Sequence, residues 1–317
     1  MESAIIQSIN LKSYAKINLT LDVKGIHDNG FHEVEMIMQQ ILLCDDISIR
    51  WHGGGDGFAV NLKTNRRYLP VDERNLAYKA AMLMKEESDR DGEEICGKLD
   101  IDIKKRIPVA GGLAGGSGNG AAVLHALNVI WGKDMDVKGL IEIGSKLGSD
   151  VPFCIMGQAA ENMNLKGRFA DDPLACHCAL ATGTGTELKP LKGLKSHLIL
   201  SKPAISVSTA GVYKGIDSEE IPERPDTGAM IAALEEENRC EIEKNMVNVL
   251  ENYTLKRYAV VMYTKNKIQR ECNPRSVLMS GSGPTVFGLC NSREEAKRIC
   301  DIMRKENSES FWTRTTW

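Results

Sequence analysis

The 317-residue chain lacks any long uninterrupted run of apolar residues, and this absence argues against a secreted protein and against a membrane-spanning protein. Polar and charged side chains break up residues 1–18, so this segment has no apolar centre of the kind found in a secretory signal peptide. No other apolar run approaches the roughly 20 residues that a membrane-spanning helix requires. We therefore expect a cytoplasmic protein that does not associate with membranes.

The sequence also lacks an excess of charge of either sign. It contains 40 Lys and Arg residues against 43 Asp and Glu residues, which gives a net charge of −3. A nearly neutral chain has no general electrostatic attraction for nucleic acid or for anionic lipid. We therefore expect no nucleic-acid partner. As separate expectations, the partner is a small-molecule substrate and the chain is a monomer or a homodimer.

Paired cysteine spacing is missing as well. The nine cysteines are an odd number scattered through the chain, which indicates reduced thiols rather than a disulfide framework. Cys176, His177 and Cys178 form a local cluster that could be interpreted as metal ligands. A zinc site needs a second Cys/His pair at suitable spacing, and the sequence has none. We predict an ordinary loop there and no protein-bound metal.

Alternating patterns predict several strands and helices. Residues 14–24 are the clearest strand, and the alternation directs Lys16 and Asn18 away from the core. A helix is predicted over residues 75–87, and Asp136 is predicted to cap another helix that extends to residue 147.

The second half of the chain mixes strands with helices, and Thr209 is predicted to cap a short helix that reaches Tyr213. No internal repeat or low-complexity tail is present. At about 150 residues per domain, the length predicts roughly two domains.

A glycine-rich segment over residues 108–120 leads into an apolar helical pattern that begins at Ala121. A loop of this kind exposes backbone N–H groups at a helix N-terminus, where these donors and the helix dipole bind anions. Six glycines lie in the ten positions 111–120, more than a tight turn needs for its backbone angles. We therefore favour phosphate binding over a purely structural turn.

The usual phosphate-binding motifs do not account for this loop. Gly-Lys-Ser/Thr of the Walker loop is absent, as are the catalytic motifs of protein kinases. Gly116, Gly118 and Ala121 fit the dinucleotide pattern GxGxxA, with Asp136 at a suitable distance. That pattern should directly follow a buried strand, whereas charged residues precede this loop. The dinucleotide interpretation is therefore weak.

Three short motifs, in order along the chain, resemble those of the GHMP kinases, named after galacto-, homoserine, mevalonate and phosphomevalonate kinases. They are Ala-Lys-Ile-Asn at residues 15–18, the glycine-rich loop at 108–120, and Ser-Gly-Ser-Gly-Pro-Thr at 280–285. The resemblance implies an α+β fold with two domains and the active cleft between them. It also implies transfer of phosphate from ATP, with Mg²⁺, to an alcohol.

The same resemblance implies a division of the chain into domains. Residues 1–160 match the N-terminal GHMP kinase domain with its ATP-phosphate loop, and residues 179–317 match the C-terminal domain. Residues 158–177 look like an inserted loop of the exposed kind.

Further segments are similar to one branch of the family, whose substrate is methylerythritol linked to cytidine diphosphate. They are residues 30–36, 75–81, 148–153 and 202–209. This similarity implies phosphorylation of the 2-hydroxyl of that substrate, in non-mevalonate isoprenoid biosynthesis. Two alternatives stay open: a GHMP kinase for another small alcohol such as homoserine or mevalonate, and a non-catalytic nucleotide-binding relative.

The resemblance implies roles for particular residues. Lys16 and Asp150 match the catalytic pair; without it, a solvated strand lysine and a helix-end cap would be preferred. His32 matches the residue that pairs with the cytosine edge, Tyr213 an aromatic that stacks on the ring, and Asn75 an adenine contact. The substrate-binding positions match Asn18, Phe31, His32, Thr209 and Tyr213. The ATP-binding positions match Asn75, Pro108, Val109, Ala110, Gly111, Gly112, Leu113, Ala114, Gly115, Gly116, Ser117 and Gly118.

The phosphate loop departs from the usual pattern of the family. Gly-Gly-Ser-Ser is usually followed by Asp or Asn and then Ala, but here Ser117 precedes Gly118, Asn119 and Gly120. One hydroxyl is lost, and each glycine in a helical turn costs roughly 0.5–1 kcal/mol relative to alanine.

Overall fold

The computed structural model describes residues 6–28, 30–273 and 276–317. The chain forms two compact units, each discontinuous in sequence. Unit 1 comprises the chain up to Tyr14, Cys44–Ile107 and Ala114–Cys176; unit 2 comprises Ala15–Leu43, Pro108–Leu113 and His177–Trp317. These boundaries differ from the predicted division into residues 1–160 and 179–317, because two long strands contribute to both units. The division into family domains stays a prediction.

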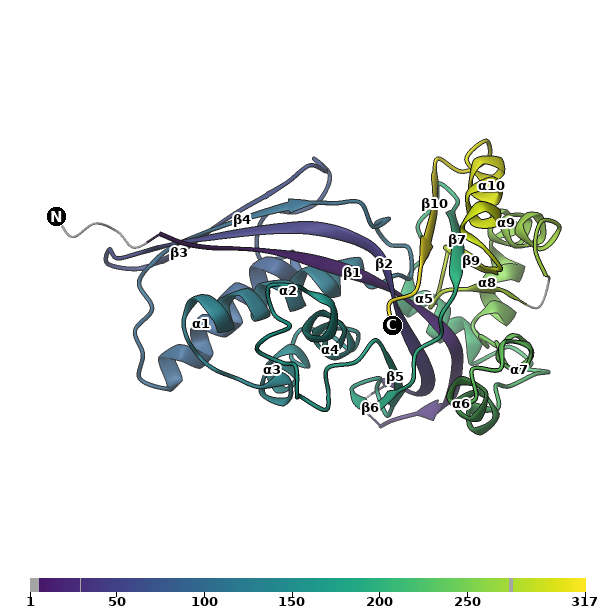
Figure 1. Cartoon of the computed structure of the whole chain (residues 1–317), viewed down its shortest axis with the longest axis horizontal. Coiled ribbons are helices and arrows are strands. Elements are labelled where there is room, and N and C mark those ends of the chain that lie inside the picture. The colour runs from purple at the N-terminus through teal and green to yellow at the C-terminus, as the bar shows by residue number, and fades with distance from the viewer. Residues whose placement is uncertain (1–5, 29, 274–275) are drawn as a thin grey trace. The chain divides into compact units, whose positions relative to one another are not determined.

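The two long strands are β1 (Ile6–Ile26) and β2 (His32–Gly53), which pair with each other. In unit 1 they are followed by β3 (Phe58–Thr64), α1 (Leu76–Arg90), β4 (Gly97–Lys104), α2 (Gly115–Ile130), α3 (Val137–Gly144) and α4 (Val151–Glu161). Strand β4 pairs antiparallel with the second half of β2 and parallel with β3. Helix α2 packs against α1 and α4, and the four helices gather on one side of β3 and β4 (Figure 1).

Local sequence signals explain where the helices of unit 1 begin. Asn75 caps α1, because its Oδ1 accepts a hydrogen bond from the Ala77 backbone N–H at 3.0 Å. The predicted cap of α3 is confirmed: Oδ1 of Asp136 accepts from the Gly139 N–H at 2.8 Å. That helix ends at Gly144, three residues before the predicted end, because residues 145–147 form a turn.

Unit 2 contains the following elements: β5 (Cys178–Thr182), β6 (Glu187–Leu191), β7 (His197–Lys202), α5 (Thr209–Ile216), α6 (Thr227–Glu235), α7 (Arg239–Lys244), α8 (Glu251–Arg257), α9 (Ala259–Gln269), β8 (Val277–Met279), β9 (Val286–Cys290), α10 (Arg293–Met303) and β10 (Glu309–Arg314). Strand β5 pairs with the first half of β2 and with β6. A four-stranded antiparallel sheet has the order β10-β7-β9-β8, and α9 and α10 cover one of its faces (Figure 1).

The cap of α5 differs from the prediction by one residue. Ser208, not Thr209, accepts the hydrogen bond from the Gly211 N–H, at 3.2 Å. Ser208 has extended backbone angles, which an N-cap residue needs, whereas Thr209 is already the first residue of the helix.

The segment over residues 158–177 is not a loop throughout. Residues 158–161 complete α4, and Gln158 is fully buried with its Nε2 donating to the Gly118 carbonyl at 2.8 Å. Beyond the helix, Leu165 and Phe169 are buried. Asn162 pairs with the backbone of Lys12 in both directions, at 2.7 and 2.9 Å. The expectation of an exposed loop is therefore wrong for these parts, and the insertion itself stays a prediction.

In the part of the chain that the structure describes, no helix combines the length and apolarity that crossing a membrane would require.

Candidate active site

Strand β1 places two predicted site residues side by side. Lys16 and Asn18 point to the same face, as the alternation predicts, but they are not solvated: their exposed fractions are 4% and 0%. Lys16 Nζ donates to Asn18 Oδ1 at 2.7 Å. The Asn18 amide in turn donates to the Met36 sulfur at 3.2 Å. A lysine with a buried side chain is not a solvated strand residue, so that alternative is wrong.

The first half of the phosphate loop, residues 108–113, belongs to unit 2 and contacts both other motifs. The Lys16 backbone N–H donates to the Leu113 carbonyl at 3.2 Å. The Ser280 hydroxyl donates to the Gly112 carbonyl at 2.9 Å. Gly112 has a φ of +73°, and a Cβ there would lie 2.2 Å from the backbone carbonyl oxygen of Ser280, so glycine is required. Unit 2 thus brings the first and third motifs onto one end of the loop.

The second half of the loop forms the start of α2 in unit 1. Ala114 has a φ of 55° and no side-chain oxygen that could cap the helix. The first helical bond runs from the Gly118 N–H to the Ala114 carbonyl, at 2.8 Å. The N–H groups of Gly115, Gly116 and Ser117 precede that bond and have no partner within the helix. This end of α2 has the donors and the dipole that bind an anion such as phosphate.

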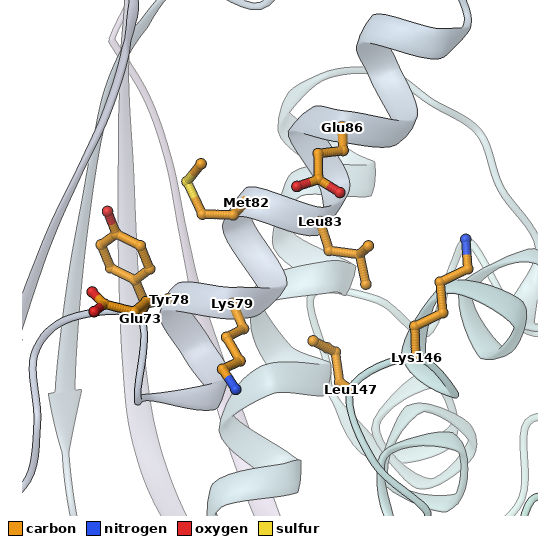
Figure 2. A pocket seen from close by; sticks show the side chains of 8 residues that line it. All are labelled: Glu73, Tyr78, Lys79, Met82, Leu83, Glu86, Lys146 and Leu147. Atoms are coloured by element: carbon orange, nitrogen blue, oxygen red, sulfur yellow. The ribbon is translucent and has the colours of Figure 1, made fainter.

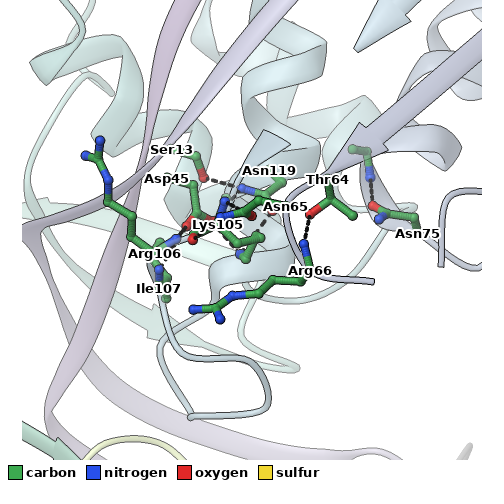
Figure 3. Close-up of polar contacts among 12 residues, drawn as sticks. Ser13, Asp45, Thr64, Asn65, Arg66, Asn75, Lys105, Arg106, Ile107 and Asn119 are labelled. Carbon is green, nitrogen blue, oxygen red and sulfur yellow. Dashed lines mark hydrogen bonds and ion pairs between the residues drawn. The ribbon is translucent and has the colours of Figure 1, made fainter. Parts of the chain in front are cut away.

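A buried polar network holds this end of α2 in place, and the sequence analysis missed it (Figure 3). Lys105 forms an ion pair with Asp45 and donates to Asn119 Oδ1 at 3.1 Å. The Asn119 amide donates to Asp45 Oδ2 at 2.9 Å and to the Ser13 hydroxyl at 3.0 Å. Burial lowers the pKa of Lys105, and the Asp45 carboxylate opposes that shift.

The same network reaches the chain that enters the loop. Asp45 Oδ1 accepts from the backbone N–H groups of Arg106 and Ile107, at 2.7 and 2.9 Å. Asp45 thus links the entrance of the loop to the first turn of α2. The charged run before the loop, which weakened the dinucleotide interpretation, contains the lysine of this network.

Asn75, the predicted adenine contact, lies in unit 1 and already has structural partners. Besides capping α1, its amide donates to the Pro70 carbonyl at 2.8 Å. The next residue, Leu76, packs under the phosphate loop: a Cβ on Gly120 would lie 3.3 Å from its carbonyl oxygen. Asn75 therefore precedes a residue that contacts the loop. Its role toward adenine stays a prediction.

The predicted base-binding residues meet in unit 2. The His32 and Tyr213 rings lie with their centroids 5.1 Å apart and their planes at 47°. His32 Nε2 lies 2.9 Å from Asp217 Oδ1, a partner that the sequence analysis did not identify. Phe31 is 61% exposed. Thr209 Oγ1 lies 3.0 Å from the Ser282 hydroxyl of the third motif.

Asp150, the other predicted catalytic residue, belongs to unit 1. It is half-buried and directly precedes α4, and its carbonyl accepts the Cys154 N–H at 3.2 Å. Pro152 at the start of α4 fits the first turn of a helix, where a missing N–H has no consequence. The backbone thus places Asp150 at the beginning of a helix.

Metal-ligating residue types do not cluster within the ranges 6–28, 30–273 and 276–317: no three His, Cys, Asp or Glu side chains there could hold one ion. The Cys176–Cys178 segment leads into β5, and the His177 carbonyl accepts the Gln40 N–H at 2.8 Å.

A pocket of about 240 Å³ lies elsewhere on unit 1, on the exposed side of α1 (Figure 2). Its lining residues are Glu73, Tyr78, Lys79, Met82, Leu83, Glu86, Lys146 and Leu147. They include none of the predicted site residues, and they mix carboxylates with ammonium groups. This pocket is therefore distinct from the phosphate loop.

Comparison with known families agrees with the three motifs. The profile of the GHMP kinases N terminal domain matches residues 75–158, and that of the GHMP kinases C terminal domain matches residues 230–309. The chain belongs to the GHMP kinases, a family of small-molecule kinases.

Curated relatives that are similar to nearly the whole chain share one name. A protein of Alkaliphilus oremlandii (strain OhILAs) is 41% identical over 98% of this chain and 97% of its own length. One of Alkaliphilus metalliredigens (strain QYMF) is 42% identical, covering 92% of this chain and 91% of its own. Both are named 4-diphosphocytidyl-2-C-methyl-D-erythritol kinase.

Solved structures agree with the fold. A crystal structure of 4-(cytidine 5'-diphospho)-2C-methyl-D-erythritol kinase matches with a TM-score of 0.75 and 26% identity, over 98% of this chain and 100% of that one. Homoserine kinase from Cytophaga hutchinsonii matches with a TM-score of 0.69 and 18% identity, over 100% and 96% of the two chains. The second likeness concerns the fold alone.

Proposed function

We propose that this chain transfers the γ-phosphate of ATP to the 2-hydroxyl of 4-diphosphocytidyl-2-C-methyl-D-erythritol, giving the 2-phosphate and ADP. The curated relatives that bear this activity in their names cover nearly the whole chain. The step belongs to non-mevalonate isoprenoid biosynthesis.

The observation that carries the choice of substrate is the contact between His32 and Tyr213. Their rings lie 5.1 Å apart, although one begins β2 and the other lies on α5. An aromatic ring beside a hydrogen-bonding imidazole offers a base both a stacking face and an edge to pair with. A kinase for homoserine or mevalonate has no use for a base-binding pair.

In the proposed transfer, the substrate oxygen forms a bond to the γ-phosphorus while the bond from that phosphorus to the bridging oxygen breaks, and ADP leaves. Asp150 accepts the proton of the hydroxyl. Lys16 offsets the negative charge that develops on the transferred group. The burial of Lys16 beside Asn18 supports this role, because electrostatic attraction is stronger away from bulk water.

We assign ATP to the glycine-rich loop. The uncapped start of α2 supplies N–H donors for the phosphates, and the side chain of Ser117 lies in the same turn. ATP would bring Mg²⁺ as its complex, held through phosphate oxygens and water rather than by a dedicated protein cage.

The test is an assay of ADP release with Mg·ATP and four acceptors: the cytidyl compound, homoserine, mevalonate and galactose. We expect turnover with the cytidyl compound alone. Turnover with another alcohol alone would agree with the assignment of ATP to the glycine-rich loop and would contradict the assignment of a base to His32 and Tyr213. Folded protein that binds ATP but turns over none of the four would reject the kinase function and favour a non-catalytic relative.

A further inference from the structure

We propose that Asp217 is a positioning residue that fixes the tautomer of His32 and thereby selects cytosine over uracil. This inference rests on the proposed function, because it concerns the base of that substrate. It assigns specificity to a carboxylate that does not itself contact the base.

Helix α5 presents three polar or aromatic residues on one side. Thr209 begins the helix, Tyr213 lies one turn later, and Asp217 is the C-cap residue another turn later. Asp217 keeps right-handed helical angles, φ −60° and ψ −23°, so the spacing of four residues places all three on the same side. His32 contacts the last two of them.

The chemistry of the Asp217 contact places a proton on Nε2 of His32. An ionised carboxylate can only accept a hydrogen bond, so Nε2 of His32 must be the donor across the 2.9 Å distance. In a neutral imidazole with the proton on Nε2, Nδ1 is an acceptor. The His32 side chain is only 12% exposed, which limits its freedom to turn to another partner.

An acceptor at Nδ1 distinguishes the two pyrimidines. Cytosine carries a donating amino group at C4, whereas uracil carries an accepting carbonyl there. Nδ1 can therefore accept from the amino group of cytosine, and it meets uracil acceptor to acceptor. Leaving buried polar groups unpaired is the strongest basis for rejecting a close analogue.

The position of Asp217 also argues against a purely structural role. A negative charge at the C-terminus of a helix opposes the helix dipole. Lys214 in the last turn is the residue type that the dipole favours there. Asp217 thus occupies a position that helix stability alone disfavours, and the partner it has there is His32.

The experiment compares Asp217→Ala and Asp217→Asn with the wild type, at saturating Mg·ATP, on cytidine- and uridine-diphosphate-linked methylerythritol. The matched control is Glu219→Gln, a nearby carboxylate that pairs with Lys256 at 2.5 Å. For Asp217→Ala we expect KM for the cytidyl substrate to rise about tenfold, because His32 loses the partner that orients it and its single hydrogen bond to the base is lost. We expect kcat and KM for ATP to stay unchanged.

Asp217→Asn makes the sharper prediction. Its amide can turn to donate to Nε2, which moves the imidazole proton to Nδ1 and creates a donor for the uracil carbonyl. Turnover of the uridyl substrate should therefore rise in this variant and not in Asp217→Ala. The preference for cytosine should fall about tenfold, corresponding to a single hydrogen bond.

A second readout reports the tautomer directly. In ¹⁵N-histidine-labelled protein, with His32→Gln used to assign the signal, the wild type should show His32 protonated at Nε2, and Asp217→Asn should shift it toward Nδ1. A merely structural role would not move this signal. If the wild type does not phosphorylate the cytidyl substrate, the proposed function fails; if it does, but both Asp217 variants match Glu219→Gln in both assays, the inference about Asp217 is wrong.

Discussion

Lys16 has a positive charge in a strand segment where both faces are buried. Residues 15–22 of β1 are each at most 4% exposed, so the ammonium group has lost most of its water. Asn18 Oδ1 replaces part of that hydration at 2.7 Å. Desolvating a charge is costly, and an apolar residue of similar length would cost less. The burial of a lysine at this position therefore supports the catalytic role that we propose for Lys16.

We predict that Asp150→Asn lowers kcat by about 10²–10⁴-fold, the range for removal of a general base. KM for ATP should change little, because the proposed phosphate site lies at the start of α2. The control is Asp136→Asn, another aspartate at a helix start in unit 1; asparagine caps a helix as well as aspartate does. Steady-state kinetics at saturating substrates measure both variants. Turnover of Asp150→Asn close to that of the wild type would contradict the assigned role.

The burial of Lys105 also leads to a prediction. Lys105→Met leaves the Asp45 carboxylate buried without its cation, and breaking such a pair costs about 3–5 kcal/mol. Lys105→Met with Asp45→Asn removes both charges and should recover part of that loss. Urea unfolding measures the stability. KM for ATP should rise in the single variant, since Asp45 links the loop entrance to α2. Equal stability of the single variant and the wild type would argue against the network.

At the scale of elements, α2 is where the departures from the family pattern have structural reasons. A Cβ on Gly118 would lie 2.6 Å from the Ser13 hydroxyl, which is the acceptor for Asn119, and 3.2 Å from the Tyr14 carbonyl. The usual serine would fit there only if the Ser13 hydroxyl moved aside and the Tyr14 carbonyl shifted slightly. The nearest atom to a Cβ on Gly116 is 3.7 Å away, on Leu76. Close packing thus explains the glycine at position 118, whereas the space around Gly116 would admit a methyl group.

We therefore predict opposite effects for two alanine variants. Gly116→Ala should stabilise the protein by up to about 1 kcal/mol, because alanine restricts the unfolded chain and suits a helix better. Gly118→Ala should destabilise it by about 1–3 kcal/mol, the usual cost of overpacking. Thermal or urea unfolding of the pair decides the matter. A stabilising Gly118→Ala would mean that Ser13 moves aside freely.

The sequence predicted elements better than contacts. The cap at Asp136 is local, so residue type and spacing were enough to predict it. The cap at Asn75 is equally local, but the prediction placed Asn75 inside the helix. Alternation gave the correct face of Lys16 but not its burial, because periodicity does not report what covers a face. The contact of His32 with Asp217 joins residues 185 apart in sequence. Only the fold brings such partners together.

At the scale of the whole molecule, the two units are linked by more than one crossing of the chain. Strands β1 and β2 each contribute to both units, and the glycine-rich loop passes from unit 2 to unit 1 between Leu113 and Ala114. Length alone suggested two domains in succession. The strands' great length, 21 and 22 residues, could not be predicted, because alternation was legible only in parts of them.

Global stability should depend on pH through His125. Its side chain is fully buried in α2, its Nε2 lies 2.9 Å from the Ile155 carbonyl, and Phe169 packs edge-on against it. Burial lowers the pKa of His125 from 6.5 to about 4. Between these values the unfolded chain binds a proton that the folded chain does not, so lowering the pH favours unfolding.

The stability contribution is therefore intact above pH 6.5 and is lost as the pH falls toward 4. A shift of this size corresponds to about 3 kcal/mol. His125→Gln does not titrate and can still donate to the Ile155 carbonyl, so its free energy of unfolding should fall less steeply than that of the wild type across this range. Urea unfolding at several pH values measures both proteins. Parallel curves for His125→Gln and the wild type would contradict the prediction. They would show that the folded protein accommodates a protonated imidazole where His125 packs against Ile155 and Phe169.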